Sequence, residues 1–435
     1  MDALYPVIGG RRLICHSEVD TLHEPYALIL DTNVIKDIGS FYFGHRQISP
    51  KLRQLLSYIR SQCRATRMSL GAAGVCYRLG LTELSLKRNN GVNYSQFRNY
   101  GSAVCKLITC GEDEFAWICD TTPSYAYSYD SNIDETVDSC VSLESGYLPI
   151  FYGSILYLLA IQLEKTSHQK TIDESINQFE RFYKWAHDDL GFITALPTLL
   201  ALYQLLGKDG NSKETRYRGN ARHLTKFDPN KITKPSELAN CAWNAAWDIL
   251  FLMRLSDYNT GEVLRREGKD PHSIPTVLIS KDYDPAWLSF STNPLGELYT
   301  ADGSTTLPYF ESSSDFFDPF HVMSKDQRAA FWKRLNAVKT SCSRKTEDPI
   351  ERTNHSIIAV HELENHLGID PTRFPSLENR YLNSSGFLKG SARKVVYHLT
   401  KNLMYKLLIE DKLSVRTIRK SLGAELHSMK QISAP

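Results

Sequence analysis

The chain has 435 residues, of which 42% are hydrophobic and 23% are charged. This length favours roughly two to four domains, or one domain with a large insertion. The composition is close to that of an average globular protein, which excludes disorder over most of the chain. The formal net charge of +2 excludes a strongly basic protein, so nucleic-acid binding has to be argued from local charge.

The cysteines and the apolar stretches indicate in which cellular compartment the protein is expected. The nine cysteines are scattered without a C-x-x-C pair, which indicates neither a disulfide framework nor a zinc finger. We therefore expect reduced thiols and a cytoplasmic protein. Tyr147–Leu163 and Phe192–Leu206 are apolar but shorter than the ~20 residues of a membrane span, so both predict buried core helices and no membrane partner. Met1–Val7 lacks the apolar run of a secretory signal.

The first predicted strand is Tyr26–Leu30, which reads YALIL and is followed by Asp31. A short apolar run bounded by polar residues is typical of a buried strand in a parallel sheet. Ser49 and Pro50 then predict the start of a helix, because serine is a good N-cap and proline fits the first helical position.

Two further segments complete the N-terminal part of the predicted core. Met68–Val75 is small and apolar and predicts a second strand or its exit, and Tyr77–Leu86 predicts a helix that carries Glu83. Asn89–Gly91 then predicts a turn.

From residue 91 to residue 235 the sequence pattern changes from alternating strands and helices to helices, which predicts a helical insertion. Helices are expected at Tyr147–Lys165, Glu174–His187 and Phe192–Leu206. Gly207–Phe227 is polar and basic and predicts a loop.

The closing part of the predicted core begins at Ser236, which opens an apolar helix that carries Asp248. Thr276–Ser280 reads TVLIS and predicts a second buried strand, followed by Lys281 and Asp282. After it we expect an irregular stretch to about residue 322 within a mostly helical, basic C-terminal region, 291–435. Its expected helices are Lys325–Lys339, Ile357–Leu367, Ala392–Leu408 and Val415–Leu422.

Acidic side chains follow the two clearest predicted strands. Asp31 comes directly after the first strand and Asp282 lies two residues after the second. In open α/β sheets, ligands bind outside the carboxyl ends of the strands. If these strands are neighbours in one parallel sheet, both carboxylates point into the same crevice.

Three segments resemble parts of PIN-domain nucleases. Tyr26–Ile35, YALILDTNVI, resembles the opening strand of that family, in which Asp-Thr-Asn and a hydrophobic residue follow the strand. Ala246–Leu255 is similar to the family's helix that presents an inward Asp. Pro275–Asp284 is similar to the next strand, which usually ends Thr-x-Asp; here Ser280 replaces the threonine and keeps a hydroxyl.

The resemblance implies an α/β fold with a PIN-like parallel sheet core, residues 1–90 and 236–290, that is split by the helical insertion 91–235. Glu83 is the best match to the family's second acid. The implied catalytic residues are Asp31, Glu83, Asp248 and Asp282, with Asp31, Asp248 and Asp282 as metal ligands. Asn33 would brace the loop after the first strand.

Clustered carboxylates of this kind need a divalent cation, because the cation relieves their mutual repulsion. Mg²⁺ and Mn²⁺ prefer hard oxygen ligands, and Mg²⁺ usually keeps several waters. Such a cation lowers the pKa of a bound water and stabilises charge on a phosphodiester during cleavage. The expected cofactor is therefore Mg²⁺ or Mn²⁺.

Local basic sequence supplies candidate phosphate contacts. Ile38–Thr82 holds seven Lys and Arg residues and no acid, and the chain beyond Lys389 is also rich in Lys and Arg. Phosphate contacts give affinity without sequence choice. The alternative is that each basic zone is an ordinary solvated helix face. The predicted substrate-binding residues are Asn33, Arg46, Arg53, Arg60, Arg64 and Lys281.

Each of the four acids also has a structural alternative, either a turn or an ion pair. The alternatives are turn capping by Asp31, a strand-exit turn at Asp282 and Asp284, an ion pair of Asp248 with Arg254 or another basic residue, and an ion pair of Glu83 with Lys87.

Taken with the resemblance, the sequence predicts a metal-dependent endonuclease. RNA is favoured over DNA because many PIN proteins cut RNA. Such nucleases often serve as toxins or defence effectors that a protein partner holds in check, and the insertion would offer a regulatory surface. The rival interpretation is a catalytically inert PIN-like scaffold or nucleic-acid-binding subunit. The sequence leaves a homo-oligomer open.

Overall fold

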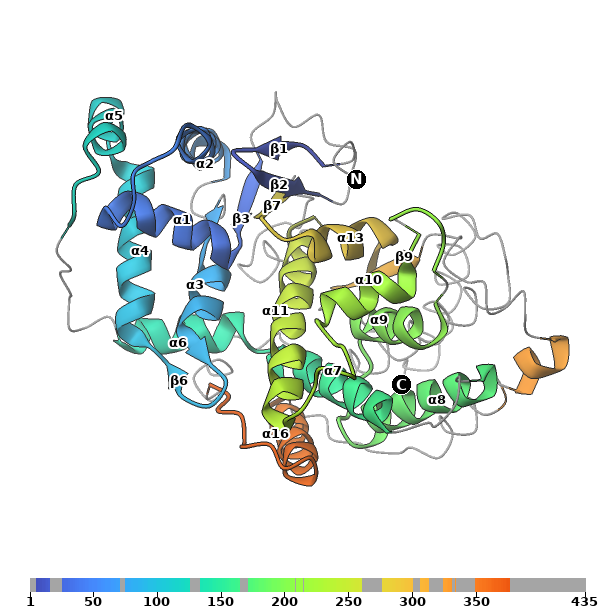
Figure 1. The fold of residues 1–435 in the computed structure, drawn as a ribbon. Coiled ribbons are helices and arrows are strands. Elements are labelled where there is room, and N and C mark those ends of the chain that lie inside the picture. The colour runs from blue at the N-terminus through green and yellow to red at the C-terminus, as the bar shows by residue number, and fades with distance from the viewer. Residues whose placement is uncertain are drawn as a thin grey trace, which may run out of the picture. The chain divides into compact units, whose positions relative to one another are not determined.

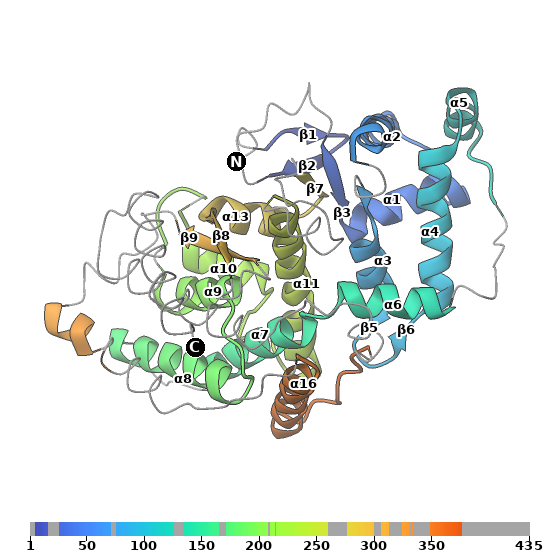
Figure 2. The same ribbon diagram turned by 180° about the vertical axis from the view of Figure 1, so that it is seen from behind.

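The computed structural model describes the chain in segments, which form two compact units that are treated separately here (Figure 1, Figure 2). The first unit holds the described residues of Met1–Gly146, Arg254–Ser289 and Thr372–Asn383, and the second holds those of Tyr147–Met253 and Phe290–Pro371. The described residues are 5–15, 26–70, 75–125, 134–164, 171–207, 209–213, 215–259, 276–299, 306–312, 324–330, 333 and 349–375.

A five-stranded sheet lies in the first unit, in the order β1-β2-β7-β3-β4. Strands β7, β3 and β4 are parallel, β1 and β2 form an antiparallel hairpin, and β2 is antiparallel to β7. The parallel sheet predicted from the sequence is therefore correct for three strands, and the hairpin makes the sheet mixed. The strands are β1 (Val7–Ile8), β2 (Arg11–Ile14), β3 (Ala27–Leu30), β4 (Val75–Cys76) and β7 (Thr276–Ser280).

The predicted pairing of the two apolar strands is confirmed. Leu28 of β3 lies beside Val277 of β7, and Leu30 lies beside Ile279, in parallel register. All residues of both strands are buried, as expected for interior strands whose two faces are both covered. The carboxyl ends of β3 and β7 consequently lie next to each other.

Six described helices between β3 and residue 146 lie with this sheet in the first unit. Ser49 accepts a hydrogen bond from the backbone N–H of Leu52 at 3.2 Å, which confirms the predicted helix start at Pro50. The predicted helix that carries Glu83 is confirmed as α3. The helices are α1 (Thr32–Phe43), α2 (Pro50–Leu70), α3 (Arg78–Ser85), α4 (Tyr94–Thr109), α5 (Glu112–Thr121) and α6 (Asp134–Glu144).

Short elements join these helices in the first unit. The predicted turn Asn89–Gly91 lies in a hairpin of β5 (Leu86–Lys87) and β6 (Gly91–Val92), and Gly91 has a φ of 69°. Helix α13 (Tyr283–Ser291) begins just after β7. Helix α11 (Pro235–Asn259) contributes residues to both units, with its last residues from Arg254 assigned to the first.

The second unit is mostly helical, and the three helices predicted at its start are confirmed. The fully apolar faces of α7 and α9 are buried, and α16 packs against α7. An antiparallel hairpin of β8 and β9 completes it. The elements are α7 (Leu148–Leu163), α8 (Ile172–Asp188), α9 (Ala195–Leu206), α10 (Tyr217–Leu224), β8 (Thr292–Tyr299), β9 (Thr306–Ser312) and α16 (Pro349–His366).

Several sequence predictions need correction. The predicted loop Gly207–Phe227 contains α10, and the stretch after residue 291 that was expected to be irregular contains β8 and β9. Met68–Leu70 is the end of α2, and the strand that follows is only Val75–Cys76. The predicted helices Ala392–Leu408 and Val415–Leu422 lie outside the described residues, as does the part of Lys325–Lys339 beyond residue 333.

The division into units falls at other places than the predicted domain boundaries. Residues 91–146 of the predicted insertion belong to the unit that contains the sheet, whereas the part of α11 before Arg254 belongs to the other unit. None of the described helices has the length and apolar character to cross a membrane.

Candidate metal centre at the ends of strands β3 and β7

Asp31 lies between the end of β3 and the first turn of α1. Its backbone is extended (φ −65°, ψ 155°), and its side chain makes no capping hydrogen bond to the helix. The capping role considered from the sequence is therefore wrong. Instead, the carboxylate accepts a hydrogen bond from the Ser280 hydroxyl at 2.6 Å, and the Asp31 backbone N–H donates to the Ile279 carbonyl at 3.2 Å.

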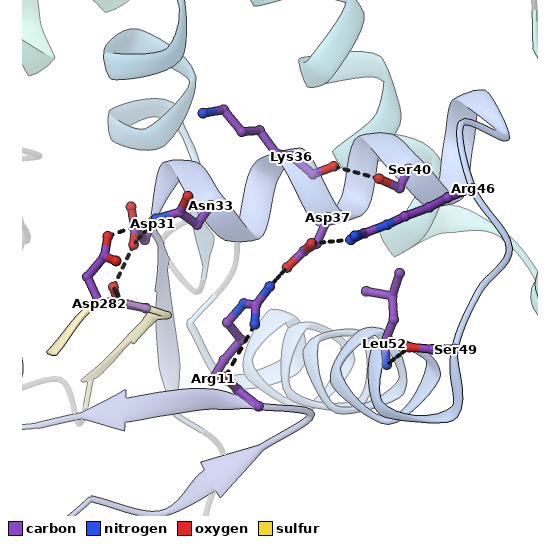
Figure 3. A network of polar contacts seen from close by, with 12 residues as sticks. Arg11, Asp31, Asn33, Lys36, Asp37, Ser40, Arg46, Ser49, Leu52 and Asp282 are labelled. Carbon is purple, nitrogen blue, oxygen red and sulfur yellow. Dashed lines mark hydrogen bonds and ion pairs between the residues drawn. The ribbon is translucent and has the colours of Figure 1, made fainter.

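Asp282 lies opposite Asp31 at the end of β7 (Figure 3). The Asn33 amide donates to a carboxylate oxygen of Asp282 at 2.9 Å and lies 3.5 Å from an oxygen of Asp31. The backbone N–H of Asp282 donates to the Ser280 hydroxyl at 3.0 Å. Asn33 and Ser280 thus each contact both acids, so one amide and one hydroxyl fix the spacing of the pair.

Glu83 reaches the same strand end from α3. The Thr32 hydroxyl contacts the Glu83 carboxylate and also lies 3.2 Å from the Gly80 carbonyl. A Cβ at Gly80 would lie 2.4 Å from the Leu30 carbonyl oxygen, so only glycine lets α3 approach the end of β3 this closely. Glu83 is one helical turn after Gly80, and the close approach therefore positions its carboxylate.

The three carboxylates influence one another. Burial raises the pKa of Asp31, and the Asp282 charge raises it further, while hydrogen bonds from Ser280 and Asn33 oppose the shift. Burial and then the Asp31 charge raise the pKa of Glu83 to about 8, against the opposing effects of Thr32 and Lys36. Carboxylates that are withdrawn from solvent and repel one another in this way are stabilised by a cation.

The donor set fits a hard cation held by a few protein ligands. Mg²⁺ is commonly bound through one or two carboxylates and keeps several waters, and Asp31 and Asp282 would supply those two. Among the described residues, no three His, Cys, Asp or Glu side chains are arranged to hold one ion together. Glu83 would therefore act beside the ion, through water, or on a second ion.

Asp248 lies on α11, is half-buried, and belongs to the second unit, whereas the other three acids belong to the first. The ion-pair partner considered for it, Arg254, contacts Glu144 at 2.9 Å and Asp257 at 3.1 Å. The role of Asp248 as a ligand stays a prediction. The alternative for Glu83 was an ion pair with Lys87 one turn along a helix. This helical spacing is not present, because α3 ends at Ser85 and Lys87 lies in β5.

The predicted phosphate-binding arginines pair with acids of the same unit. Arg46 contacts Asp37 at 2.5 Å, and Arg53 contacts Asp120 at 2.7 Å. Arg60 and Arg64 both contact Glu112. Arg60 is only 2% exposed, and its guanidinium also lies over the Phe115 ring. Phosphate binding by these residues stays a prediction, and each would have to share or leave an acidic partner. Lys281 is exposed.

Sequence reasoning missed three features that shape this centre. Gly80 was visible only as a glycine inside a predicted helix, which is a weak signal of close packing. Lys36 lowers the pKa of Glu83, and it lies on the helix that follows Asp31. Arg12 lies at the register position of Ser280 on β2 and donates to the Lys281 carbonyl at 3.1 Å; no pattern had predicted β2.

Comparison of the chain with protein-family models, with curated proteins and with solved structures gave no match.

Proposed function

We propose that this chain is a divalent-metal-dependent endonuclease that cleaves phosphodiester bonds, with RNA favoured as substrate. The observation that carries the proposal is the juxtaposition of Asp31 and Asp282 at neighbouring parallel strand ends, joined through Asn33 and Ser280. Carboxylates at such strand ends lie where ligands bind in α/β sheets. The PIN-like motif at Tyr26–Ile35 supports the choice of phosphodiester chemistry.

Each residue has a role in this proposal. A bound Mg²⁺ or Mn²⁺ would supply a water of lowered pKa and stabilise charge on the phosphodiester. Asp31 and Asp282 would hold the ion, while Asn33 and Ser280 keep the two carboxylates apart and oriented. Glu83 would position an ordered water, and its raised pKa would let it accept a proton from that water. Asp248 is retained as the fourth acid on the family resemblance alone.

The setting of this activity is also carried over from the resemblance. A cytoplasmic toxin or defence effector held in check by a protein partner is the role we propose for such a nuclease. Lys281, exposed beside Asp282, would contact substrate phosphates.

A catalytically inert PIN-like scaffold or nucleic-acid-binding subunit is the second candidate. It is favoured by one observation: no three acidic, His or Cys side chains of the described residues are arranged around a single ion position. The two candidates differ in whether the protein cleaves nucleic acid, and whether that cleavage needs the acids at the strand ends.

Cleavage assays separate the two candidates. Labelled RNA and labelled DNA are incubated with the protein in Mn²⁺ and, in parallel, in EDTA. We expect cleavage in Mn²⁺ only, and its loss in Asp31→Asn and Asp282→Asn. Asp113→Asn, a change at an exposed acid on α5, is the matched control and should cleave like the wild type. Cleavage that survives both strand-end substitutions refutes the site, and absence of cleavage by the wild type favours the scaffold.

A further inference from the structure

A second polar cluster lies further along α1, around Asp37 (Figure 3). Arg11 of β2 and Arg46 of the segment after α1 each contact Asp37, on different carboxylate oxygens, and the Arg46 contact is 2.5 Å. Two guanidinium groups face one carboxylate, so this cluster of Arg11, Asp37 and Arg46 carries one net positive charge.

The two arginines differ in how far they are open to solvent. The Asp37 side chain is 8% exposed and that of Arg11 is 16% exposed, whereas that of Arg46 is 56% exposed. A guanidinium has five N–H donors in a planar fork, and one carboxylate oxygen satisfies few of them. Arg46 is thus held by a buried acid at one side and presents the rest of its fork to solvent, a geometry that suits a phosphate.

The position of the cluster relates it to the strand-end acids. Asn33 and Asp37 are four residues apart on α1 and therefore lie on the same side of the helix. At a rise of 1.5 Å per residue, Asp37 is about 9 Å further along the axis than Asp31. One nucleic-acid strand advances ~3.4 Å per nucleotide along a duplex axis. If a strand held at Asp31 and Asp282 runs along α1, another of its phosphates reaches the cluster about three nucleotides away.

The positive charge of this cluster would help a nucleic-acid strand to bind near the acids. Asp31 and Asp282 lie at neighbouring strand ends with Glu83 nearby, and these carboxylates together repel a polyanion. A strand that approaches them needs positive charge nearby, because phosphate contacts dominate the affinity of proteins for nucleic acids. Two arginines of α2 are less suited, because Arg60 is buried and Arg64 shares Glu112 with it.

We propose that Arg11 and Arg46, oriented by Asp37, form a subsite for a backbone phosphate that flanks the scissile phosphate of a nucleic-acid strand. The word scissile rests on the proposed nuclease function, whereas the phosphate contact itself does not. Arg11 thereby gains a role that the sequence did not suggest. The competing explanation is an ion-pair cluster that only fastens β2 to α1.

The test measures binding without cleavage. Fluorescence anisotropy of a labelled single-stranded RNA, and of a DNA of the same base sequence, is followed in EDTA over a series of salt concentrations. One lost phosphate contact on a single strand reduces the slope of log K against log salt by about 0.7. We expect this reduction in Arg46→Gln, and the wild-type slope in Arg46→Lys, which keeps the charge. The reduction should be equal for RNA and DNA.

Arg181→Gln is the matched control, because Arg181 is 48% exposed and pairs with Glu164 at 2.6 Å. It removes the same charge and should keep the wild-type slope. The subsite is overturned if Arg46→Gln binds with the wild-type slope, if Arg181→Gln shows the same reduction, or if the reduction occurs on RNA alone.

The outcomes also separate this proposal from the nuclease proposal. Binding that depends on Arg46 in a protein that does not cleave in Mn²⁺ supports the subsite and refutes the nuclease. Cleavage with an unchanged slope in Arg46→Gln refutes only the subsite.

Discussion

Replacing Gly80 by alanine tests how α3 positions Glu83. The new Cβ would lie 2.4 Å from the Leu30 carbonyl oxygen and 3.0 Å from a side-chain carbon of Ile35. The closer contact cannot be relieved without moving α3 away from the end of β3, because the Leu30 carbonyl oxygen belongs to the backbone. The shift would weaken the contacts of the Thr32 hydroxyl with the Gly80 carbonyl and with Glu83.

Gly101 on α4 provides the matched control. A Cβ there would meet only Leu81, at an ordinary distance of 3.5 Å. Both substitutions gain the same helix propensity of ~1 kcal/mol, so this gain cancels when they are compared. What is left is the cost of overpacking at Gly80, about 1–3 kcal/mol. At ~2–4 °C per kcal/mol for a unit of this size, Gly80→Ala should unfold about 2–12 °C below Gly101→Ala.

Two assays measure the consequences. Thermal unfolding followed by intrinsic fluorescence gives the Tm difference, and RNA cleavage in Mn²⁺ gives the functional loss. Misplacement of a reacting group by 1 Å can lower a rate about 100-fold, and we expect a loss of roughly tenfold to 100-fold for Gly80→Ala and none for Gly101→Ala. Equal Tm values and equal cleavage rates for the two variants would refute the role of the close approach.

Three further predictions concern the acids of the centre. The folded-state pKa of Glu83 is raised to about 8 from 4.5, so between these pH values the folded chain keeps a proton that the unfolded chain has released. In EDTA the Tm should therefore fall as the pH rises from 4.5 to about 8, and it should fall less in Glu83→Gln. Equal pH dependence of the Tm in the two proteins would contradict the raised pKa of Glu83. Ser280→Ala removes the hydrogen bond to Asp31 and should lower the free energy of unfolding in urea by about 1–3 kcal/mol. Ser280→Thr keeps a hydroxyl and should preserve the hydrogen bond. A Ser280→Ala variant as stable as the wild type would show that the hydrogen bond does not stabilise the fold. Asp248→Asn should lower cleavage, whereas the control Asn244→Ala on the exposed side of α11 should not; wild-type cleavage by Asp248→Asn would remove this residue from the proposed site.

The sheet core could be predicted because its strands are short, fully apolar runs. The predicted strand Thr276–Ser280 has the bounds of β7, and Tyr26–Leu30 differs from β3 by one residue. The pairing of Asp31 and Asp282 follows from the parallel register of these strands. The hairpin β1–β2 was missed because β1 has only two residues and β2 begins with two arginines, and Gly9 and Gly10 turn between them with φ of 57° and 78°.

Other errors have local causes. The helix α10 was hidden because Gly219 and Asn220 interrupt a polar segment, although its buried residues Tyr217, Ala221 and Leu224 follow helical spacing. The hairpin β8–β9 contains Pro294, Gly296 and Pro308, which are unusual in strand interiors.

The charge of the α2 region could not be judged from its own sequence. Ile38–Thr82 has no acid, yet Glu112 and Asp120 of α5 neutralise arginines of α2 in the folded chain. Such pairing joins residues that are distant in sequence, so local charge counts overstate the basic surface. Gly80 has the same character, since its importance depends on the Leu30 carbonyl of another element.

The central claim is that Asp31 and Asp282 together hold a divalent cation, and calorimetric titration of the protein with Mn²⁺ tests it most directly. We predict saturable binding to the wild type and to Asp113→Asn, and at least about tenfold weaker binding to Asp31→Asn and to Asp282→Asn, as expected when a carboxylate ligand of a hard cation is lost. Wild-type affinity in both strand-end variants would contradict the account.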